Sequence, residues 1–154
     1  MTVANAKLRF WCDMSMECVR RDHTPGLSAG DQKGPFLTAR ALGMALAALN
    51  DANAHAAGRT TLLNIPATPG LVGANADIAG AAASAEVLRL RYPNQSHLRE
   101  PAWLHWLEYF GFGPAGSPAE MAGRAFGTLV HQKGAADPAK AAADQYTLPT
   151  PGTP

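Results

Sequence analysis

The chain has 154 residues, of which 47% are apolar and 16% are charged, and its formal net charge is +1. This length and apolar content favour one domain with its own core. The small net charge gives no field that would attract nucleic acid or an anionic membrane surface. The longest apolar run, residues 41–49, is much shorter than the ~20 residues that span a bilayer. Since the N-terminus also lacks the features of a secretory signal, we expect a cytoplasmic protein.

The spacing of apolar residues predicts an all-α bundle of about five or six helices. The first predicted helix covers residues 5–21 and ends at His23-Thr-Pro-Gly26. Cys12 and Cys18, the only cysteines, lie about 240° apart around the axis of this helix, so they cannot form a disulfide with each other. We expect two small, half-buried thiols, with a link to another chain as the alternative.

Residues 34–57 are predicted to form a second helix, because a proline in the first turn costs no hydrogen bond. Arg40 and Asp51 fall on nearly the same side of this helix, among apolar residues. A charge on an apolar stripe requires a partner, so we expect each to pair with an opposite charge from another helix. The candidates for Asp51 are Arg20 and Arg21. The alternative for both residues is a solvated position at the rim of the bundle.

A third predicted helix, residues 75–92, follows a loop at 59–72 and consists largely of alanine. Because small side chains let neighbouring helices approach closely, we expect this helix to be central. Pro101 is predicted to open a fourth helix, in which residues 103–110 are rich in aromatic side chains. Their wide apolar surface requires burial in the core or against another chain. The alternative is that the aromatic rings line a ligand cavity.

Ser117 and Glu120 form a capping box, in which the serine hydroxyl accepts from an amide of the first helical turn and the glutamate reaches back. The box predicts the start of a fifth helix. Gly134 is the type of residue that ends a helix in a left-handed conformation, so we expect the fifth helix to end before it.

The last short helix is predicted to begin at Asp137-Pro138 and to end near Gln145. The helical domain then covers residues 1–148. Residues 149–154 form a coil tail of proline, threonine and glycine.

Two patterns that look like known sites do not fit their structural context. Residues 111–116 have the glycine spacing of a dinucleotide-binding loop, but they follow a helix rather than a strand, and Pro114 interrupts them. The histidines include no pair at the helical spacing of three or four residues that binds a metal. We expect each histidine to be a surface or interface residue; they are His23, His55, His97, His105 and His131.

Different short motifs follow one another along these helices, in an order that is known from one protein family. Those of the first two helices are Phe10-Trp11, Glu17, Arg20-Arg21-Asp22-His23-Thr24, Gly34-Pro35, Arg40-Ala41-Leu42 and Asn50-Asp51-Ala52. Those of the later helices are Leu88-Arg-Leu-Arg-Tyr92-Pro93, Gly123-Arg-Ala-Phe-Gly127, and Lys133 through Asp137 to Tyr146. In this order and spacing the chain resembles the N-terminal helical half of the vanadium-dependent haloperoxidases. The resemblance implies an all-helical bundle, shared with acid phosphatases of the same superfamily, and frequently an interlocked oligomer.

The resemblance also implies that vanadate is bound, and this chain has too few of the lysine, arginine and histidine motifs that bind it in the family. The family holds vanadate, an oxyanion, with three late motifs: a lysine and an arginine before a proline, then Pro-Ser-Gly-His, then an arginine and a histidine ahead of an aspartate. This sequence contains no Pro-Ser-Gly-His. Lys33 and Arg40 match a fragment of the first motif, but Ala41 stands where the proline belongs, so we interpret the match as a coincidence. We therefore expect no catalytic, cofactor-binding or metal-binding residue in this chain.

The leading hypothesis is that the chain is the scaffold and oligomerisation half of a haloperoxidase-like protein, which as a whole oxidises halide with hydrogen peroxide. Vanadate is then expected in a complementary C-terminal chain or segment, and this chain is not catalytic by itself. The alternative is a non-catalytic helical interaction module that forms a homo-oligomer. An enzyme complete in this chain is a third possibility. None of the three involves nucleic acid or a membrane.

Overall fold

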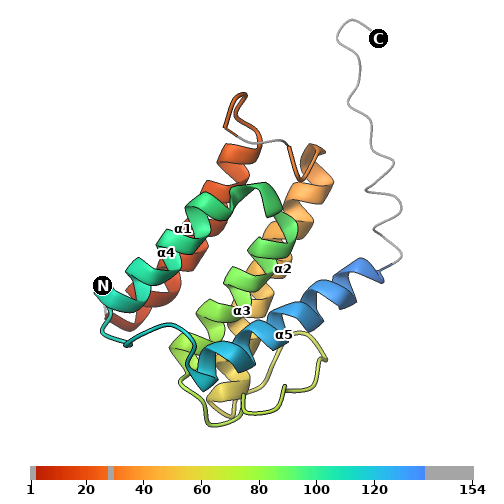
Figure 1. The fold of residues 1–154 in the computed structure, drawn as a ribbon. Helices are drawn as coiled ribbons and strands as arrows, with labels where there is room; N and C mark the ends of the chain where they lie inside the picture. The colour runs from red at the N-terminus through yellow and green to blue at the C-terminus, as the bar shows by residue number, and fades with distance from the viewer. Residues whose placement is uncertain (1–2, 28–29, 138–154) are drawn as a thin grey trace, which may run out of the picture.

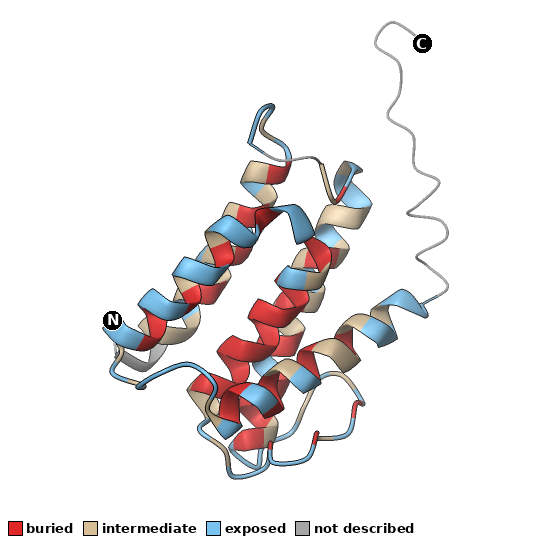
Figure 2. Ribbon diagram, viewed as in Figure 1, coloured by how far each residue is buried: buried red, intermediate tan, exposed pale blue. Residues whose placement is uncertain are grey.

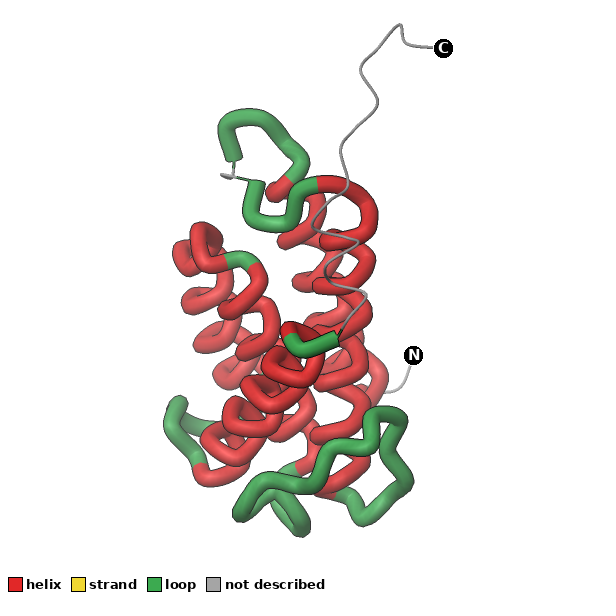
Figure 3. The backbone as a smooth tube through the Cα atoms, turned by 90° about the vertical axis from the view of Figure 1, so that its right-hand side faces the viewer, coloured by secondary structure: helices red, strands yellow, loops and turns green. Residues whose placement is uncertain are grey.

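The computed structural model describes residues 3–27 and 30–137, with side chains from residue 6 onward, and this part of the chain is helical without strands. The predicted all-α class is therefore confirmed (Figures 1 and 3). The helices are α1 (Val3–Asp22), α2 (Gly34–Ala56), α3 (Ala76–Arg91), a short 3-10 turn (Pro93–Gln95), α4 (Ser96–Tyr109) and α5 (Pro118–Ala135). The short helix predicted at 138–145 and the coil tail predicted at 149–154 lie outside the described residues.

The predicted start of α4 was wrong. The helix begins at Ser96 rather than at Pro101, because the 3-10 turn leads directly into it. Pro101 therefore lies inside the helix, where it removes one backbone hydrogen bond. Across the described residues, none of the helices has the combination of length and apolar character that crossing a bilayer requires.

Helix α3 is central, as the sequence predicts. Its residues from Ile78 to Leu88 are all buried, and Figure 2 shows this burial along α3 and on the side of α2 that faces it. Helices α2 and α5 pack against α3, while α1 and α4 lie together on another side of it (Figure 1). The loops that follow α2 and α4 lie at one end of the bundle (Figure 3).

Small residues set the distance between α3 and its neighbours. A Cβ atom added at Gly80 of α3 would lie 2.8 Å from the carbonyl oxygen of Leu49 in α2. On α5, a Cβ at Gly123 or Gly127 would meet backbone carbonyl groups of α3. Both α2 and α5 therefore touch α3 backbone to backbone, and this contact requires glycine at these positions.

Aromatic rings join α1 to α4. The ring centroids of Trp11 and Trp103 are 5.6 Å apart, and those of Trp103 and Trp106 are 5.5 Å apart. Trp106 also donates a hydrogen bond from its Nε1 to the carbonyl oxygen of Lys7, at 3.1 Å. The inner face of the aromatic helix thus forms part of the core, which is one of the two places predicted for it.

The two cysteines of α1 form no disulfide with each other, as predicted, and one of them is more deeply buried than expected. Cys18 is fully buried, and burial raises the pKa of its thiol to about 12. Cys12 is partly exposed, and burial together with the nearby charge of Asp13 raises its pKa to a smaller degree. Since the nucleophilic form of cysteine is the thiolate, Cys18 is an inert member of the core.

The predicted partner of Asp51 was wrong. This fully buried carboxylate accepts hydrogen bonds from the backbone amides of Leu62 and Leu63, at 2.8 and 2.6 Å. Arg20 and Arg21 instead hydrogen-bond to Glu17, and they lower the pKa of that carboxyl to about 2. The backbone amides of the loop that follows α2 need hydrogen-bond acceptors. The buried carboxylate of Asp51 lies beside them and supplies two acceptor oxygens.

Arg40 has an opposite charge as its partner, as predicted, but that partner follows α5 and does not lie in a helix. Its guanidinium lies 3.2 Å from a carboxylate oxygen of Asp137, which follows the last turn of α5, and it also donates to the carbonyl oxygen of Gly134. This ion pair connects the first half of α2 to the end of α5.

Replacing Gly127 with alanine tests the close contact between α3 and α5. The new Cβ meets the backbone of Ala83 and lies 2.9 Å from the Cβ of Glu86, so we expect a loss of about 1–3 kcal/mol in the free energy of unfolding. Gly43→Ala on α2 is the matched control, because its Cβ has no neighbour within 4 Å and should stabilise the helix by about 0.5–1 kcal/mol. Urea unfolding followed by circular dichroism measures both. Equal stability of the two variants would contradict the proposed contact.

Replacing Asp51 with alanine tests its role as an acceptor for the loop. The two amides lose a charged partner, and we expect the protein to lose about 2–3 kcal/mol of stability. Asp51→Asn should lose less, because one carbonyl oxygen can still accept from one amide. Asp13→Ala, which removes an exposed carboxylate of α1, should have little effect and serves as the control. Thermal unfolding of the three variants provides the measurement.

Candidate functional site

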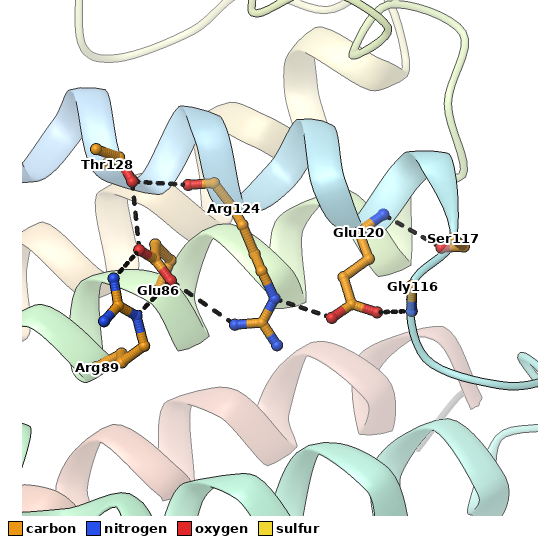
Figure 4. A network of polar contacts seen from close by, with 7 residues as sticks. All are labelled: Glu86, Arg89, Gly116, Ser117, Glu120, Arg124 and Thr128. Carbon is orange, nitrogen blue, oxygen red and sulfur yellow. Dashed lines mark hydrogen bonds and ion pairs between the residues drawn. The ribbon is translucent and has the colours of Figure 1, made fainter.

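A polar network joins α3 to the start of α5 (Figure 4). Two buried carboxylates, Glu86 of α3 and Glu120 of α5, share Arg124. The Nε of Arg124 donates to Glu120 at 2.9 Å, and its Nη1 lies 3.7 Å from Glu86. Arg89 and Thr128 complete the network by hydrogen bonds to Glu86. Because every carboxylate of the network has a cation within reach, its role is to hold helices together.

The predicted capping box forms one end of this network. Ser117 Oγ accepts from the amide of Glu120 at 3.2 Å, and the Glu120 carboxylate accepts from the amide of Gly116 at 2.8 Å. The glutamate thus reaches one residue further back than the standard box, in which it bonds to the amide of the capping residue itself. Its other oxygen remains available to Arg124.

The electrostatic balance at Glu86 favours the ionised form. Burial raises the pKa of this carboxyl, but the hydrogen bonds and charge of Arg89, the charge of Arg124 and the Thr128 hydroxyl lower it by more. The pKa of Glu86 therefore lies below its ordinary value of 4.5. Arg124 also lies over the ring of Trp103, with its guanidinium carbon 5.0 Å from the ring centroid, so the same cation connects α5 to α4.

Apart from the capping box, this network was not predicted from the sequence. Glu86 and Arg89 are three residues apart, and Glu120 and Arg124 are four apart, which are the spacings of ion pairs along one helix. These two local pairs could have been found from the sequence. The contact from Arg124 to Glu86 depends on how α5 crosses α3, and no sequence pattern specifies that crossing.

The arginines of the described residues bind protein groups. Each therefore already has a hydrogen-bond acceptor or a carboxylate, whereas an oxyanion site needs several cations that converge on one point. Arg40, which together with Lys33 matches a fragment of a vanadate motif, forms an ion pair with Asp137. The partners are Glu17 for Arg20 and Arg21, Asp13 for Arg9, Asn53 for Arg59, Glu86 for Arg89, the sulfur of Met44 for Arg91, and the carbonyl of Tyr92 for Arg99.

The histidines are distributed among different surroundings. His55 is partly buried between α2 and α5, where its ring packs on Phe126 with centroids 5.3 Å apart, so it is a structural residue rather than a surface one. Burial and the charge of Arg91 lower the pKa of His131. His23, His97 and His105 are exposed, as expected. Within residues 3–27 and 30–137, the side chains of His, Cys, Asp and Glu form no group of three that could hold a metal ion.

The glycine-rich segment after α4 is a turn. Gly111, Gly113 and Gly116 have φ angles of 70°, 81° and 92°, which other residues rarely adopt. The segment ends at the cap of α5 rather than at a helix that follows a strand, so its glycines serve the backbone geometry of the connection.

The outer side of α4 carries two large apolar side chains that are exposed. We call it the α4 face and define it by the exposed residues Leu104, His105, Glu108 and Tyr109. Leu104 is 57% exposed and Tyr109 is 73% exposed. Large apolar side chains with such exposure, grouped on one helix, mark surfaces that bind other molecules.

Two hollows flank the α4 face. One, of about 400 Å³, lies between α1 and α4 and is lined by aromatic rings that include Phe10 and Phe110. The other, of about 520 Å³, is shallower and lies between α4 and the turn at residues 111–115. The exposed side chains of α4 therefore form a ridge between two apolar hollows. A ridge between two hollows is complementary to a partner that places side chains on both sides of α4.

Neither a protein-family model, nor a curated protein, nor a solved structure matches this chain.

The network at Glu86 predicts a pH dependence of stability. A carboxyl whose pKa is lower in the folded state stabilises the fold above its unfolded pKa, and this contribution is lost as the pH falls. We expect the wild-type protein to lose stability as the pH falls below about 4.5 and through the lower pKa of folded Glu86. Glu86→Gln should be less stable at neutral pH and should show a weaker pH dependence in this range. Urea unfolding at a series of pH values measures both effects, and parallel curves for the two proteins would contradict the assignment.

Proposed function

We propose that this chain is the helical scaffold half of a haloperoxidase-like protein and that its α4 face binds the complementary polypeptide. The observation that carries the proposal is the exposed ridge of Leu104 and Tyr109 between two apolar hollows. The family itself is proposed from the order of motifs in the sequence. The all-helical fold with a central alanine-rich helix is consistent with it.

The binding partners of the arginine side chains support a structural role for the chain. Its arginines bind carboxylates, carbonyls and a thioether of their own polypeptide, in contacts that join α5 to α3 and α2 to the residue that follows α5, or that stabilise single helices. A vanadate site requires cations whose donors point at an exogenous oxyanion. In the proposal, these cations and the histidine that binds vanadium belong to the complementary chain or segment. The cytoplasmic location predicted from the sequence remains part of the proposal.

The same ridge also supports the second candidate function, a helical interaction module that forms a homo-oligomer. A face that combines a ridge with flanking hollows can be complementary to a second copy of itself, because each ridge can enter a hollow of the other copy. The two proposals predict different molecular masses. A homo-oligomer has a multiple of the mass of this chain, whereas a hetero-complex contains a second polypeptide.

Purification of the chain together with its natural partners tests the leading proposal. We expect a second polypeptide that carries Pro-Ser-Gly-His and the arginine–histidine motif, identified by the intact mass and sequence of every component. The complex should oxidise bromide with hydrogen peroxide only after vanadate is added, and the isolated chain should not. Vanadate-dependent bromination by the isolated chain, or a folded monomer that binds no such polypeptide, would contradict the proposal.

A matched pair of variants locates the interface. The double variant Leu104→Asp and Tyr109→Ser should weaken the complex by a factor on the order of ten or more, because anchors at the centre of an interface dominate its affinity. Met16→Asp, on an exposed position of α1, should leave the affinity unchanged. The thermal stability of both variants should equal that of the wild type. Equal affinity of the two variants would place the interface elsewhere.

A further inference from the structure

The side chain of Arg99 in α4 is a buried cation, and only 4% of the residue is exposed. No Asp or Glu oxygen of the described residues lies within ion-pair distance of its guanidinium. Its Nη2 donates to the carbonyl oxygen of Tyr92 at 3.2 Å, whereas its Nε is buried and has no acceptor in the described part of the chain. Burial lowers the pKa of Arg99. Because arginine stays charged all the same, this part of the core holds a positive charge that no described carboxylate pairs with.

The carboxylates around Arg99 do not neutralise it. Glu86 and Glu100 favour its charged form from beyond ion-pair distance, and the charge of Arg89 opposes them. Glu86 accepts hydrogen bonds from Arg89 and also lies 3.7 Å from Arg124. Glu100 is exposed, so solvent screens its charge. A full counter-charge for Arg99 therefore has to come from outside the described residues.

Two contacts give the register between α1 and α4, which lie side by side (Figure 1). The rings of Trp11 and Trp103 are in contact, with their centroids 5.6 Å apart. Gln95, directly before α4, donates from its Nε2 to the carbonyl oxygen of Cys18 at 3.0 Å. The two helices therefore run antiparallel. Arg99, halfway between residues 95 and 103, lies between these two contacts, in the interface with α1.

Hydrogen-bond donors that lack an acceptor occur along the same interface. Besides Nε of Arg99, the indole N–H groups of Trp11 and Trp103 are buried and have no acceptor among the described residues. Arg99 and Trp103 are four residues apart, so they lie on one face of α4. In the described part of this interface, the buried acceptor without a donor is Oε1 of Gln95, while the hydroxyl of Tyr92, which can act in either role, also lacks a partner. An excess of donors around a cation favours an anion over water, because water donates as well as accepts.

We propose that the interface between α1 and α4 binds one small monovalent anion, of the size and charge of chloride, on the guanidinium of Arg99. Its Nε donates to the ion, and the indole N–H of Trp103, one turn further along α4, is the second donor. One negative charge balances one guanidinium. Arg99 lines neither of the two hollows that flank the α4 face, so the occupant is a single ion rather than an organic molecule.

This inference does not depend on the proposed function, since it concerns the inner side of α4 rather than the α4 face. A partner chain can bind to the outer side whether or not an ion lies on the inner side. The two proposals are therefore tested by different residues and can fail separately.

Thermal unfolding of the full chain at increasing chloride concentration tests the inference. An ion that binds the folded chain but not the unfolded chain raises the unfolding temperature as its concentration rises. Sodium chloride is compared with sodium gluconate at equal ionic strength, so that general screening is the same in both series. Gluconate is too large for the site. We expect a higher unfolding temperature in chloride, with a difference that grows with concentration, and equal temperatures in the two salts would overturn the inference.

A matched pair of variants connects the chloride effect to Arg99. Arg99→Met should lower the affinity for chloride by a factor on the order of ten or more, because the charged donor is lost. The variant should still fold, since an apolar side chain of similar volume tolerates burial better than an unpaired charge. Arg20→Met, which changes an exposed arginine of α1, should keep the chloride effect of the wild type. Circular dichroism verifies that both variants keep their helical content. The same chloride effect in Arg99→Met and in the wild type would overturn the inference.

Crystals of the unmodified protein grown in sodium bromide give a measurement that needs no substitution. Bromide has the charge of chloride and nearly its size, and its anomalous scattering distinguishes it from water. We expect an anomalous peak within hydrogen-bond distance of Nε of Arg99. Peaks at surface positions alone, or a water molecule at Nε of Arg99, would overturn the inference. The position of the peak also decides the matter if Arg99→Met does not fold.

Discussion

Alanine and glycine leave almost no side chain between α3 and the helices on two sides of it, so the backbones of α2 and α5 approach α3 directly. Gly80 faces the carbonyl of Leu49, and Gly123 and Gly127 face the backbone of α3. This contact fixes the crossing of the three helices, because a shift along either axis would bring a larger side chain into the contact. The central position of α3, and the positions of the polar groups at its ends, follow from it.

The polar network depends on this close approach. With α3 and α5 in backbone contact, Arg124 of α5 reaches Glu86 of α3 as well as Glu120 of its own helix. It also lies over the ring of Trp103, so one cation connects three helices. A buried charge is costly unless it is paired, and each carboxylate has a cation on its own helix, Arg89 for Glu86 and Arg124 for Glu120. Only the contact from Arg124 to Glu86 depends on how the two helices cross.

Two surfaces lie outside the core, and they differ in the size of their side chains. On α4, the rings of Trp103 and Trp106 are buried against α1, but the helix carries more apolar side chains than its inner face can hold, and Leu104 and Tyr109 remain exposed. On α2, small residues line the groove between α2 and α5. The first surface suits the large side chains of a partner.

The sequence by itself determined the helical class, the central place of the alanine-rich helix and the cap at Ser117, because these depend on the periodicity of apolar residues and on contacts within one turn. It also indicated that Arg40 needs a partner from another element. Only the tertiary structure decided that Asp51 binds the amides of Leu62 and Leu63 rather than an arginine, and that Arg124 bridges two carboxylates. The physical reason is that hydrogen bonds act over about 3 Å, so partners distant in sequence are chosen by how the helices cross.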